Sequence, residues 1–436
     1  MQAVGNGNDA RADLELAAGN GLLHRRALLA SGAGIAAALS GYTLREPAQA
    51  APLPVEPWMR EPTAVGLEPY GAPSRYESKV VRGGRNEPAG SPTSGTGSIR
   101  TPLHLLNGTI TPNGLHHVRL HSGVPDIDPD RHRLLLHGLV DRPLVYTLDA
   151  LAKYPMESHP YFLECTGNSI ELYAKEPLKA GVERLHGQIS CAEWTGVRLA
   201  TLLEEAGVKA EAKWILAEGA DAAGMARSVP LAKIADDALI ALYQNGERLR
   251  PSNGYPMRLF LPGYQGTANI KYLRRIKLIK GPAQTRDETA RYAITGADGI
   301  TTEFYLQFDA KSVITQPAPE LALRGPGLYK ISGLAWSGRG RGIIKRVEVS
   351  ADAGRSWAEA MIASPVMPKA LVRFEMLWRW DGQPAVLQSR ATDETGYTQW
   401  TRDQMLAARG PAGNYMTNCI ISWAVNEKGE LSNVYA

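Results

Sequence analysis

The sequence predicts an α+β domain over residues 101–310, followed by a β-sandwich over residues 311–436. From residue 101 to about residue 282, short apolar runs of strand length alternate with patterns of helical period. Beyond residue 311 the runs stay short, alternate apolar with polar residues and are separated by turn residues, which is typical of a sandwich. A chain of 436 residues is long enough to give both domains cores of their own.

Six segments of the first domain and four of the second are predicted to be strands. In the first domain they cover residues 133–140, 160–164, 214–217, 238–243, 257–261 and 273–279, and in the second residues 327–336, 343–350, 372–380 and 385–391. One segment, residues 197–207, spaces its apolar side chains three and four apart and ends on Gly207, which predicts a helix.

The first 50 residues have the pattern of an export signal. The pair Arg25-Arg26 opens an apolar stretch over residues 27–39, and the small residues of Ala48-Gln49-Ala50 follow as a cleavage site. The stretch is roughly half the length that a bilayer-spanning helix needs, which disfavours a membrane anchor. We therefore expect a twin-arginine signal peptide over residues 1–50, export of the folded chain and a periplasmic location.

Residues 51–100 are rich in Pro, Gly, Ser and Arg and show little apolar periodicity, so we expect an irregular N-terminal arm there. The whole chain carries 48 Lys and Arg against 44 Asp and Glu, a formal net charge of +4, with no long run of one sign. Such a balance disfavours nucleic acid as a partner.

Cysteine usage draws attention to a single residue. The three cysteines, Cys165, Cys191 and Cys419, are far apart, so their spacing provides neither a disulfide framework nor a four-cysteine zinc site. Cys165 follows an apolar run and opens a Thr-Gly-Asn turn, where one thiolate at the end of a strand can ligate a soft or transition metal. The alternative for any lone cysteine is a small buried hydrophobe, and we expect that role for Cys191 and Cys419.

Around Cys165 the chain resembles the sulfite oxidase family of molybdenum enzymes. Four segments carry the resemblance in the same order: the His-Val-Arg-Leu-His loop with Arg119 and His121, the Cys165-Thr-Gly-Asn turn, residues 245–271, and residues 333–357. The resemblance implies a sulfite-oxidase-type molybdopterin-binding catalytic domain, followed by an immunoglobulin-like dimerisation domain that makes the chain a homodimer. It also implies a molybdenum-molybdopterin cofactor.

The resemblance assigns roles to individual residues. Cys165 would ligate molybdenum, Arg119 would face the metal's oxo ligands and the substrate, and Tyr292 would place a phenol beside the metal to pass protons. A cofactor with a dithiolene and a phosphate needs fixed donors around its anionic end. The residues that match the family's cofactor-binding positions are His121, Asp221, Asn253, Arg258, Asn269, Ile270 and Lys271, and Asn253 stands where the family usually has His.

Four positions of the implied substrate pocket depart from the family. Ser169 and Ile170 stand where sulfite-oxidising members usually have two arginines, Arg184 where the family has Trp, and Met416 where it has Arg. The loss of bidentate guanidinium groups disfavours a small dianion such as sulfite. Within the family, the sulfane dehydrogenases of thiosulfate-oxidising systems fit better, and these oxidise the outer sulfane sulfur held on a carrier protein.

The chain contains no Cys-x-x-Cys-His sequence, so we expect no covalently bound haem in it. The resemblance implies that electrons leave to a separate c-type cytochrome subunit, in a heterotetramer with it. Three alternatives stay open: a sulfite dehydrogenase, a methionine-sulfoxide reductase, and an exported binding module without enzymatic activity.

Overall fold

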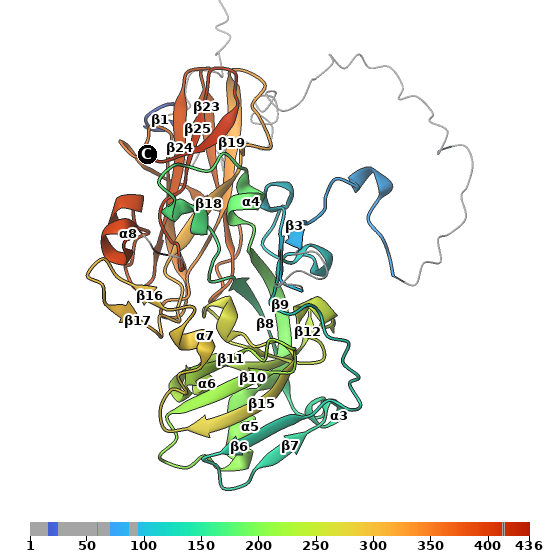
Figure 1. Cartoon of the computed structure of the whole chain (residues 1–436). Coiled ribbons are helices and arrows are strands. Elements are labelled where there is room, and N and C mark those ends of the chain that lie inside the picture. The colour runs from blue at the N-terminus through green and yellow to red at the C-terminus, as the bar shows by residue number, and fades with distance from the viewer. Residues whose placement is uncertain (1–15, 25–58, 60–69, 87–94, 412, 414) are drawn as a thin grey trace, which may run out of the picture.

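The computed structural model describes residues 16–24, 59, 70–86, 95–411, 413 and 415–436. The molecule is elongated, with a β-sandwich of C-terminal residues at one end and a mixed α+β region at the other (Figure 1). An α+β domain therefore precedes a sandwich, as the sequence predicts. None of the helices in these ranges is long and apolar enough to cross a membrane.

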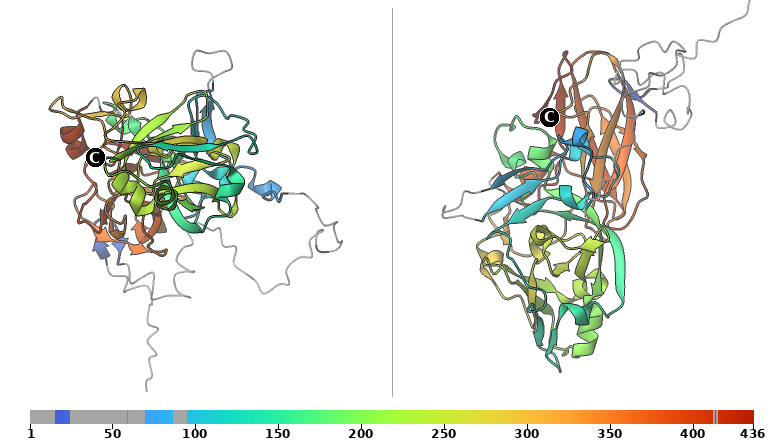
Figure 2. Two further views of the ribbon diagram at one scale, coloured as in Figure 1. Left: turned by 90° about the horizontal axis from the view of Figure 1, so that it is seen from below. Right: turned by 90° about the vertical axis from the view of Figure 1, so that its right-hand side faces the viewer.

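Two antiparallel sheets pack face to face in the sandwich (Figure 2). One has the strand order β1-β2-β23-β19-β18 with β22 beside β23, and the other has the order β21-β20-β24-β25-β26. Side chains such as Phe374, Trp378 and Trp423 fill the core between them. The strands are Leu16–Ala18 (β1), Leu22–Leu23 (β2), Lys311–Gln316 (β18), Gly327–Trp336 (β19), Ile344–Ser350 (β20), Ala358–Glu359 (β21), Met361–Ile362 (β22), Val372–Trp380 (β23), Ala385–Asp393 (β24), Ser422–Val425 (β25) and Leu431–Val434 (β26).

The α+β region is built on two larger sheets, with strand orders β11-β10-β15-β6-β7 and β13-β12-β9-β8, the second with β14 beside β12. All neighbours are antiparallel except β15 and β6. The strands are Leu134–Gly138 (β6), Leu144–Tyr146 (β7), Met156–Glu164 (β8), Ile189–Arg198 (β9), Trp214–Gly219 (β10), Ala226–Pro230 (β11), Leu239–Gln244 (β12), Glu247–Arg248 (β13), Arg258–Phe260 (β14) and Leu273–Ile279 (β15).

Helices are short throughout the described ranges. The α-helices are Leu148–Leu151 (α3), Val182–His186 (α4), Leu199–Ala206 (α5), Leu231–Asp237 (α6), Arg286–Thr289 (α7) and Arg402–Arg409 (α8). Single turns of 3-10 helix cover Arg75–Glu77, Leu103–Leu105, Asn113–Leu115, Ile170–Tyr173, Pro251–Asn253 and Gly266–Ala268, and a two-stranded ribbon joins Ile294–Thr295 (β16) to Thr301–Thr302 (β17).

Helix α5 begins later than the sequence predicts. Its end at Gly207 is as expected, because the backbone there has φ +71°, a left-handed conformation that suits glycine. Val197, however, pairs with Met156 of β8 on one side and with Ile240 of β12 on the other, so β9 continues to Arg198. Strand pairing on both sides thus outweighs the helical spacing of these two residues.

The prediction of an irregular arm over residues 51–100 is wrong for part of that range. Gly83–Asn86 (β3) and Gly97–Arg100 (β4) form a three-stranded sheet with Val118–Leu120 (β5), which carries Arg119. These short strands are held by backbone pairing and have few apolar side chains. The sequence therefore shows no apolar periodicity that would predict them. Residues 51–58, 60–69 and 87–94 lie outside the described ranges.

The predicted signal peptide also lies mostly outside the described residues. Within it, however, β1 and β2 form a hairpin that joins the sandwich sheet next to β23. The predicted twin arginines and the predicted cleavage site are not among the described residues.

Apolar side chains gather in a shared core and a distal core. The shared core fills the sandwich and continues into the α+β region through Phe162, Ile189 and Cys191, while the distal core lies between the two α+β sheets and helices α5 and α6. Cys191 and Cys419 are both fully buried in the shared core, so the prediction that they are core residues is confirmed.

Candidate functional site

Strand β8 delivers Cys165 to the place where the α+β region meets the sandwich. All nine residues of β8 pair with β9, and the pairing ends at Glu164 opposite Ile189. Beyond it, the Cys165 amide donates to the Gln188 carbonyl at 2.9 Å, and the Asn168 amide donates to the Cys165 carbonyl at 2.9 Å. A rigid strand followed by a hydrogen-bonded turn therefore fixes the position of the thiol.

Two cavities meet at Cys165. The first, which we call the inner cavity, encloses about 80 Å³ and reaches from Cys165 between β5, the 3-10 turn at Pro251–Asn253 and the loop before β15. The second, the outer cavity, encloses about 570 Å³ and lies against β3, β4 and helix α4. Cys165 and Arg119 line both, so these two side chains form the boundary between them.

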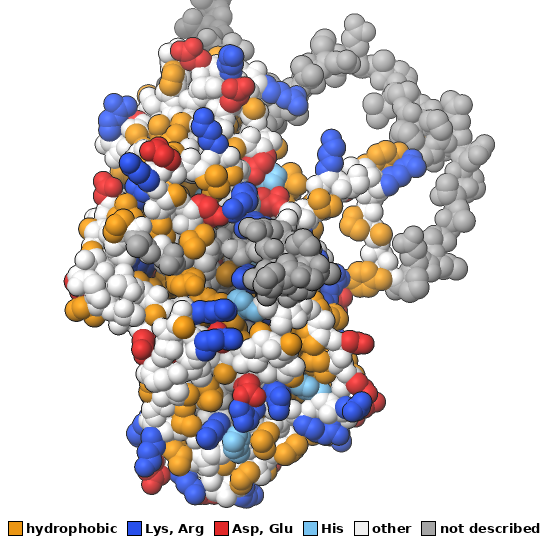
Figure 3. All heavy atoms as spheres, viewed as in Figure 1, with side chains coloured by type: hydrophobic (Ala, Val, Ile, Leu, Met, Phe, Trp, Pro, Cys, Tyr) orange, Lys and Arg blue, Asp and Glu red, His pale blue; other side chains and the backbone are white. Residues whose placement is uncertain are grey.

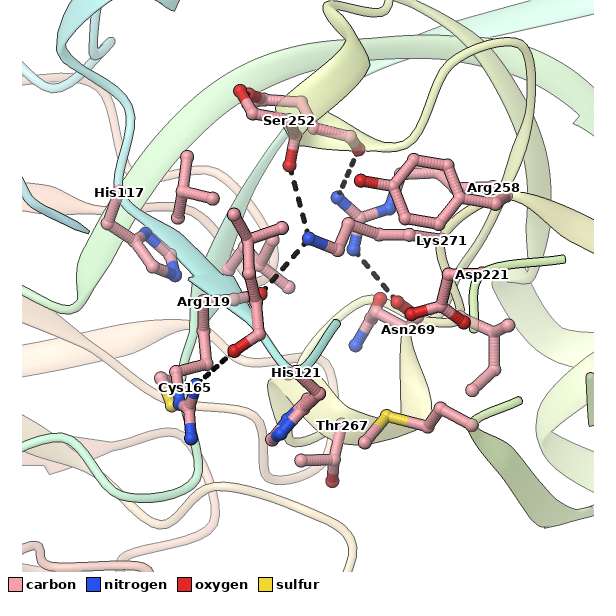
Figure 4. Close-up of a pocket in the computed structure, with 18 of the residues that line it drawn as sticks. His117, Arg119, His121, Cys165, Asp221, Ser252, Arg258, Thr267, Asn269 and Lys271 are labelled. Atoms are coloured by element: carbon pink, nitrogen blue, oxygen red, sulfur yellow. Dashed lines mark hydrogen bonds between the residues drawn. The ribbon is translucent and has the colours of Figure 1, made fainter. Parts of the chain in front are cut away.

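The inner cavity is cationic at the end remote from Cys165 (Figure 4). The Lys271 ammonium donates to the carbonyls of Arg119 at 3.0 Å and Ser252 at 3.1 Å. Burial, followed by the charge of Arg258, lowers the pKa of Lys271 to about 7. Burial likewise lowers the pKa of Arg258 to about 10. Burial therefore disfavours the charged forms of Lys271 and Arg258, and an anion placed between them would stabilise both charges.

Two donors that line this cavity are left without a partner among the described residues. They are Nε of Arg258 and the hydroxyl of Tyr272, both buried. Buried polar groups are rarely left unpaired in folded proteins. Together with one thiol and two cations, these donors fit an elongated anionic group that is soft at one end and accepts hydrogen bonds at the other, as a molybdopterin does.

The structure brings all the predicted cofactor-binding residues to the inner cavity: His121, Asp221, Asn253, Arg258, Asn269, Ile270 and Lys271 line it. Two of them also hold the loops that shape it. The Asn269 amide group bonds to the backbone of Leu261 and Gln265, and the Asn253 amide donates to Gln244 at 3.0 Å. The Asp221 carboxylate accepts from the Ser122 hydroxyl at 3.1 Å.

Tyr292 and His121 connect the two cavities. Tyr292 lines the outer cavity and His121 the inner one, and the Tyr292 hydroxyl lies 3.1 Å from Nε2 of His121. Burial, aided by the charge of Arg119, lowers the pKa of His121 to about 3, so the imidazole is neutral near pH 7. Burial also raises the pKa of Tyr292, which keeps the phenol protonated. A neutral imidazole can therefore accept the phenol's hydrogen bond.

Only two of the four residues predicted for the substrate pocket line a cavity. Ile170 and Arg184 face the outer cavity, but the Arg184 guanidinium is ion-paired with Glu171. Ser169 and Met416 line neither of these two cavities. Both residues have a left-handed backbone, with φ of +66° and +57°, and both are buried, which turns their side chains into the protein interior.

Ser169 instead belongs to a buried polar network behind Cys165. The Lys311 ammonium donates to Glu164 at 2.9 Å and to the Ser169 hydroxyl at 2.9 Å, and Trp336 donates to the other Glu164 oxygen at 2.7 Å. Lys311 and Trp336 come from β18 and β19 of the sandwich, whereas Glu164 is the last residue of β8. The sandwich thereby fixes the residue that precedes the thiol.

Sequence reasoning missed Arg100, the last residue of β4, which lines the outer cavity. Its pKa is lowered, first by burial and then by the charge of Arg184, and the charge of Cys165 acts in the opposite sense. Its guanidinium donates no hydrogen bond to any residue in the described ranges, unlike that of Arg184. Arg100 is therefore available to an anion in this cavity. Gln188 and Tyr415, which also line it, were not predicted either.

Anion binding in the inner cavity should take up protons near neutral pH. With a pKa of about 7, Lys271 is largely deprotonated at pH 7.5, and an adjacent anion raises its pKa and recharges it. Affinity for the anion should therefore fall as the pH rises through 7. Calorimetry of the cofactor-free protein with pyrophosphate, in buffers of different ionisation enthalpy, should show uptake of roughly 0.5–0.8 proton at pH 7.5.

The Lys271→Met variant should lose this proton uptake and bind the anion more weakly. A matched control is Lys209→Met, because Lys209 is exposed and does not line the cavity. Equal proton uptake by wild-type protein and Lys271→Met would show that another group titrates.

Two family models match the chain. The oxidoreductase molybdopterin binding domain matches residues 121–286, and the Mo-co oxidoreductase dimerisation domain matches residues 302–421. The first match includes Cys165 and most residues of the inner cavity, and the second lies within the sandwich and the segment before it.

Similar proteins include mitochondrial sulfite oxidase of Mus musculus, 34% identical over 277 residues that cover 59% of this chain and 50% of the mouse protein. The NAD(P)H nitrate reductase of Hordeum vulgare is 28% identical over 77% of this chain and 41% of its own length. The chain thus spans about half the length of these curated relatives or less. The crystal structure of the sulfane dehydrogenase SoxCD from Paracoccus pantotrophus is also similar, with a TM-score of 0.83 and 42% identity over 87% of this chain and 97% of that one.

Proposed function

Because the chain belongs to the sulfite oxidase family of molybdopterin oxidoreductases, we propose that it oxidises the outer sulfane sulfur of a group held on a carrier protein. Electrons would pass to a c-type cytochrome subunit. The similarity to a sulfane dehydrogenase over 97% of that chain supports this choice of substrate class.

The observation that carries the proposal is the shape and charge of the outer cavity. It encloses about 570 Å³ beside Cys165, far more than a free sulfite ion would fill. A site for a small dianion surrounds it with paired guanidinium groups. Here Ile170 occupies one of the family's arginine positions, and Arg184 is engaged by Glu171. A wide cavity with few free cations suits an extended arm that ends in an anionic sulfur group.

The residues of the inner cavity fit the cofactor that the family uses. Cys165 would ligate the molybdenum, and Arg258 and Lys271, with the unpaired hydroxyl of Tyr272, would bind the anionic end. When bound, this group supplies two-electron oxidation and oxygen transfer at sulfur.

The chain's own residues position the substrate and handle its protons. Arg119 is anchored by a 3.2 Å hydrogen bond to the Gly97 carbonyl, so its guanidinium is fixed between the two cavities, where it can bind an oxyanion. Arg100 provides the second free guanidinium, farther out in the cavity. The Tyr292 hydroxyl and Nε2 of His121 form a route along which a proton can move from the outer to the inner cavity.

The proposal includes the chain's cellular setting and assembly. The Arg25-Arg26 pair and the apolar stretch after it support export to the periplasm through the twin-arginine pathway. The dimerisation-domain match supports a homodimer, and the similarity to SoxCD supports a heterotetramer with a cytochrome partner. Basic and acidic side chains are interspersed on the face shown in Figure 3, so a protein partner is favoured over nucleic acid there.

A sulfite dehydrogenase is the second candidate. Arg119 and Arg100 both line the outer cavity, and together they could hold a small dianion beside Cys165. The similarity to mitochondrial sulfite oxidases is consistent with that activity.

Cytochrome c reduction by the purified holoenzyme distinguishes the two. We expect a kcat/KM for thiosulfate-loaded carrier protein at least about a hundredfold above that for free sulfite. Arg100→Met should raise the KM for the loaded carrier about tenfold to a hundredfold, because a charge-assisted hydrogen bond contributes about 1.5–3 kcal/mol. Arg184→Met is the matched control and should have a much smaller effect, because Glu171 already engages that guanidinium.

Full turnover with micromolar sulfite, and none with the loaded carrier, would overturn the sulfane proposal and support the sulfite dehydrogenase. Equal effects of the two arginine variants would show that Arg100 has no special role in binding the anion.

A further inference from the structure

Two adjacent histidines, His116 and His117, lie on the wall of the inner cavity just before β5. Both are buried, and their rings stack with centroids 5.0 Å apart. His116 Nδ1 donates to the His117 carbonyl at 2.9 Å, and Trp194 packs edge-on against the His116 ring. This packing restricts the rotation of both rings. Figure 4 shows the His117 ring directed toward the other side chains of the cavity.

Both imidazoles are neutral near pH 7. Burial lowers the pKa of His116 to about 3. The pKa of His117 lies well below its usual range, first because of burial and then because of nearby charges, among them Arg258 and Lys271. A neutral imidazole has one N–H donor and one bare nitrogen that accepts. The nitrogen of His117 that carries the proton therefore decides which ligand group this residue can bind.

Ser190 of β9 determines where that proton lies. Its hydroxyl oxygen accepts from the His117 backbone amide at 2.9 Å, and it lies 2.8 Å from His117 Nδ1 and 2.7 Å from the Thr101 hydroxyl. The Thr101 hydroxyl donates to the Leu115 carbonyl at 3.0 Å, because a carbonyl can only accept. The Ser190 hydroxyl must then donate to Thr101. His117 Nδ1 in turn donates to Ser190, and all four contacts are satisfied.

The opposite tautomer would leave one of these contacts without a proton. If Ser190 donated to His117 Nδ1, it would have to accept from Thr101. No proton would then remain for the Leu115 carbonyl. The proton of His117 is therefore on Nδ1, and Nε2 is a bare acceptor. Nε2 forms no hydrogen bond with any residue in the described ranges.

His117 thus provides a neutral acceptor in a cavity that also contains two cations. Those cations, an arginine and a lysine, have only donors. Asn253, which stands where the family usually has His, donates to Gln244 and accepts from the Ser252 hydroxyl, both at 3.0 Å. An anionic group of a ligand would bind the cations, and an N–H group of the same ligand would bind the bare nitrogen of His117.

We propose that Nε2 of His117 accepts a hydrogen bond from an N–H group of the cofactor's pterin ring, and that this contact helps to orient the ring in the inner cavity. A reduced pterin has N–H donors on its ring, whereas its phosphate has acceptors. This combination matches a bare imidazole nitrogen beside two cations. The inference rests on the cofactor class that the family uses and not on the choice of sulfur substrate.

The tautomer can be measured on the full-length holoenzyme labelled with 15N-histidine, because NMR shifts and couplings of the ring nitrogens distinguish N–H from bare nitrogen. At pH 7 we expect a protonated Nδ1 and a bare, hydrogen-bonded Nε2 for His117. The signal is identified by its loss in His117→Gln. Ser190→Ala removes the acceptor for Nδ1 and should allow both tautomers. A proton on Nε2 of the wild-type residue, or on both nitrogens, would overturn the proposal.

The rate of pterin release measures what the hydrogen bond contributes. Pterin released from diluted holoenzyme is oxidised to a fluorescent form and quantified, so the readout does not require turnover. His117→Phe keeps an aromatic ring but has no acceptor, and it should release pterin about threefold to tenfold faster, the usual effect of one neutral hydrogen bond. His117→Gln, whose side-chain oxygen can replace Nε2, should stay within about twofold of the wild type.

His159→Phe is the matched control, because His159 is exposed on β8 and does not line the cavity. Its release rate should equal that of the wild type. Equal release from wild-type protein and His117→Phe would overturn the inference. Release from His117→Gln as fast as from His117→Phe would overturn it too, because lost packing would then explain the effect.

These failures are distinguishable from a failure of the proposed function. Wild-type protein that contains no pterin when purified from a host that makes molybdopterin would contradict the proposed function and this inference together. A pterin that is present but held equally well without the imidazole of His117 would contradict the inference alone.

Discussion

Replacement of Cys165 by serine should lower turnover with any sulfur substrate at least about a thousandfold. A thiolate is a soft ligand, whereas a serine hydroxyl keeps its proton near neutral pH and binds such a metal poorly. Burial raises the pKa of Cys165, and the hydrogen bond from the Gly167 amide opposes this effect. A bound metal cation would complete the deprotonation.

The measurement combines dye-linked turnover with molybdenum per chain, on protein purified from a host that makes molybdopterin. Cys419→Ala is the control, because its thiol is buried in the shared core away from both cavities, and it should keep turnover within about twofold of the wild type. If Cys165→Ser retained more than about a tenth of the wild-type turnover, the thiol would not be the metal ligand.

Replacement of Lys311 by methionine should destabilise the folded protein by about 3–5 kcal/mol, the usual effect of leaving one charge of a buried pair without its partner. Lys311 and Glu164 are both almost completely buried, at 1% and 0% side-chain exposure, and their 2.9 Å ion pair joins the sandwich to the last residue of β8. Without the ammonium, the hydrogen bonds that the Glu164 carboxylate keeps within the described part of the chain are those from Trp336 and Asn168.

Urea unfolding followed by tryptophan fluorescence measures this effect. Lys330→Met is the matched control: it breaks a 2.7 Å pair with Glu375 whose lysine is 38% exposed, and it should cost about 1 kcal/mol or less. The double variant Lys311→Met with Glu164→Gln should recover much of the loss, because it removes the uncompensated charge. Equal losses from Lys311→Met and Lys330→Met would contradict a stabilising role for the buried pair.

The sequence was most informative where local pattern and environment agree. Strands β15, β19 and β23 have the predicted bounds because their apolar residues face a core along their whole length. Cys165 could be singled out because a strand leads directly into a Gly-Asn turn, and this local arrangement does not depend on distant residues.

Other parts of the site depend on contacts that no local pattern contains. The hydrogen bond between Tyr292 and His121 joins residues 171 positions apart, and only the resemblance brought them together beforehand. Arg100 was missed because its strand is held by backbone pairing with β3 and β5. Ser169 and Met416 were assigned by counting along the chain, and counting does not reveal a left-handed backbone that redirects a side chain.

Arg119 and Cys165 belong to the walls of both cavities, so the two binding sites are not independent. A ligand bound in the inner cavity restrains the Arg119 guanidinium, and a ligand in the outer cavity binds to the same group. Thermodynamic linkage then requires that each occupant change the affinity of the other by the same factor. The enzyme's relative affinities for different sulfur compounds thus depend in part on how the cofactor is bound in the inner cavity.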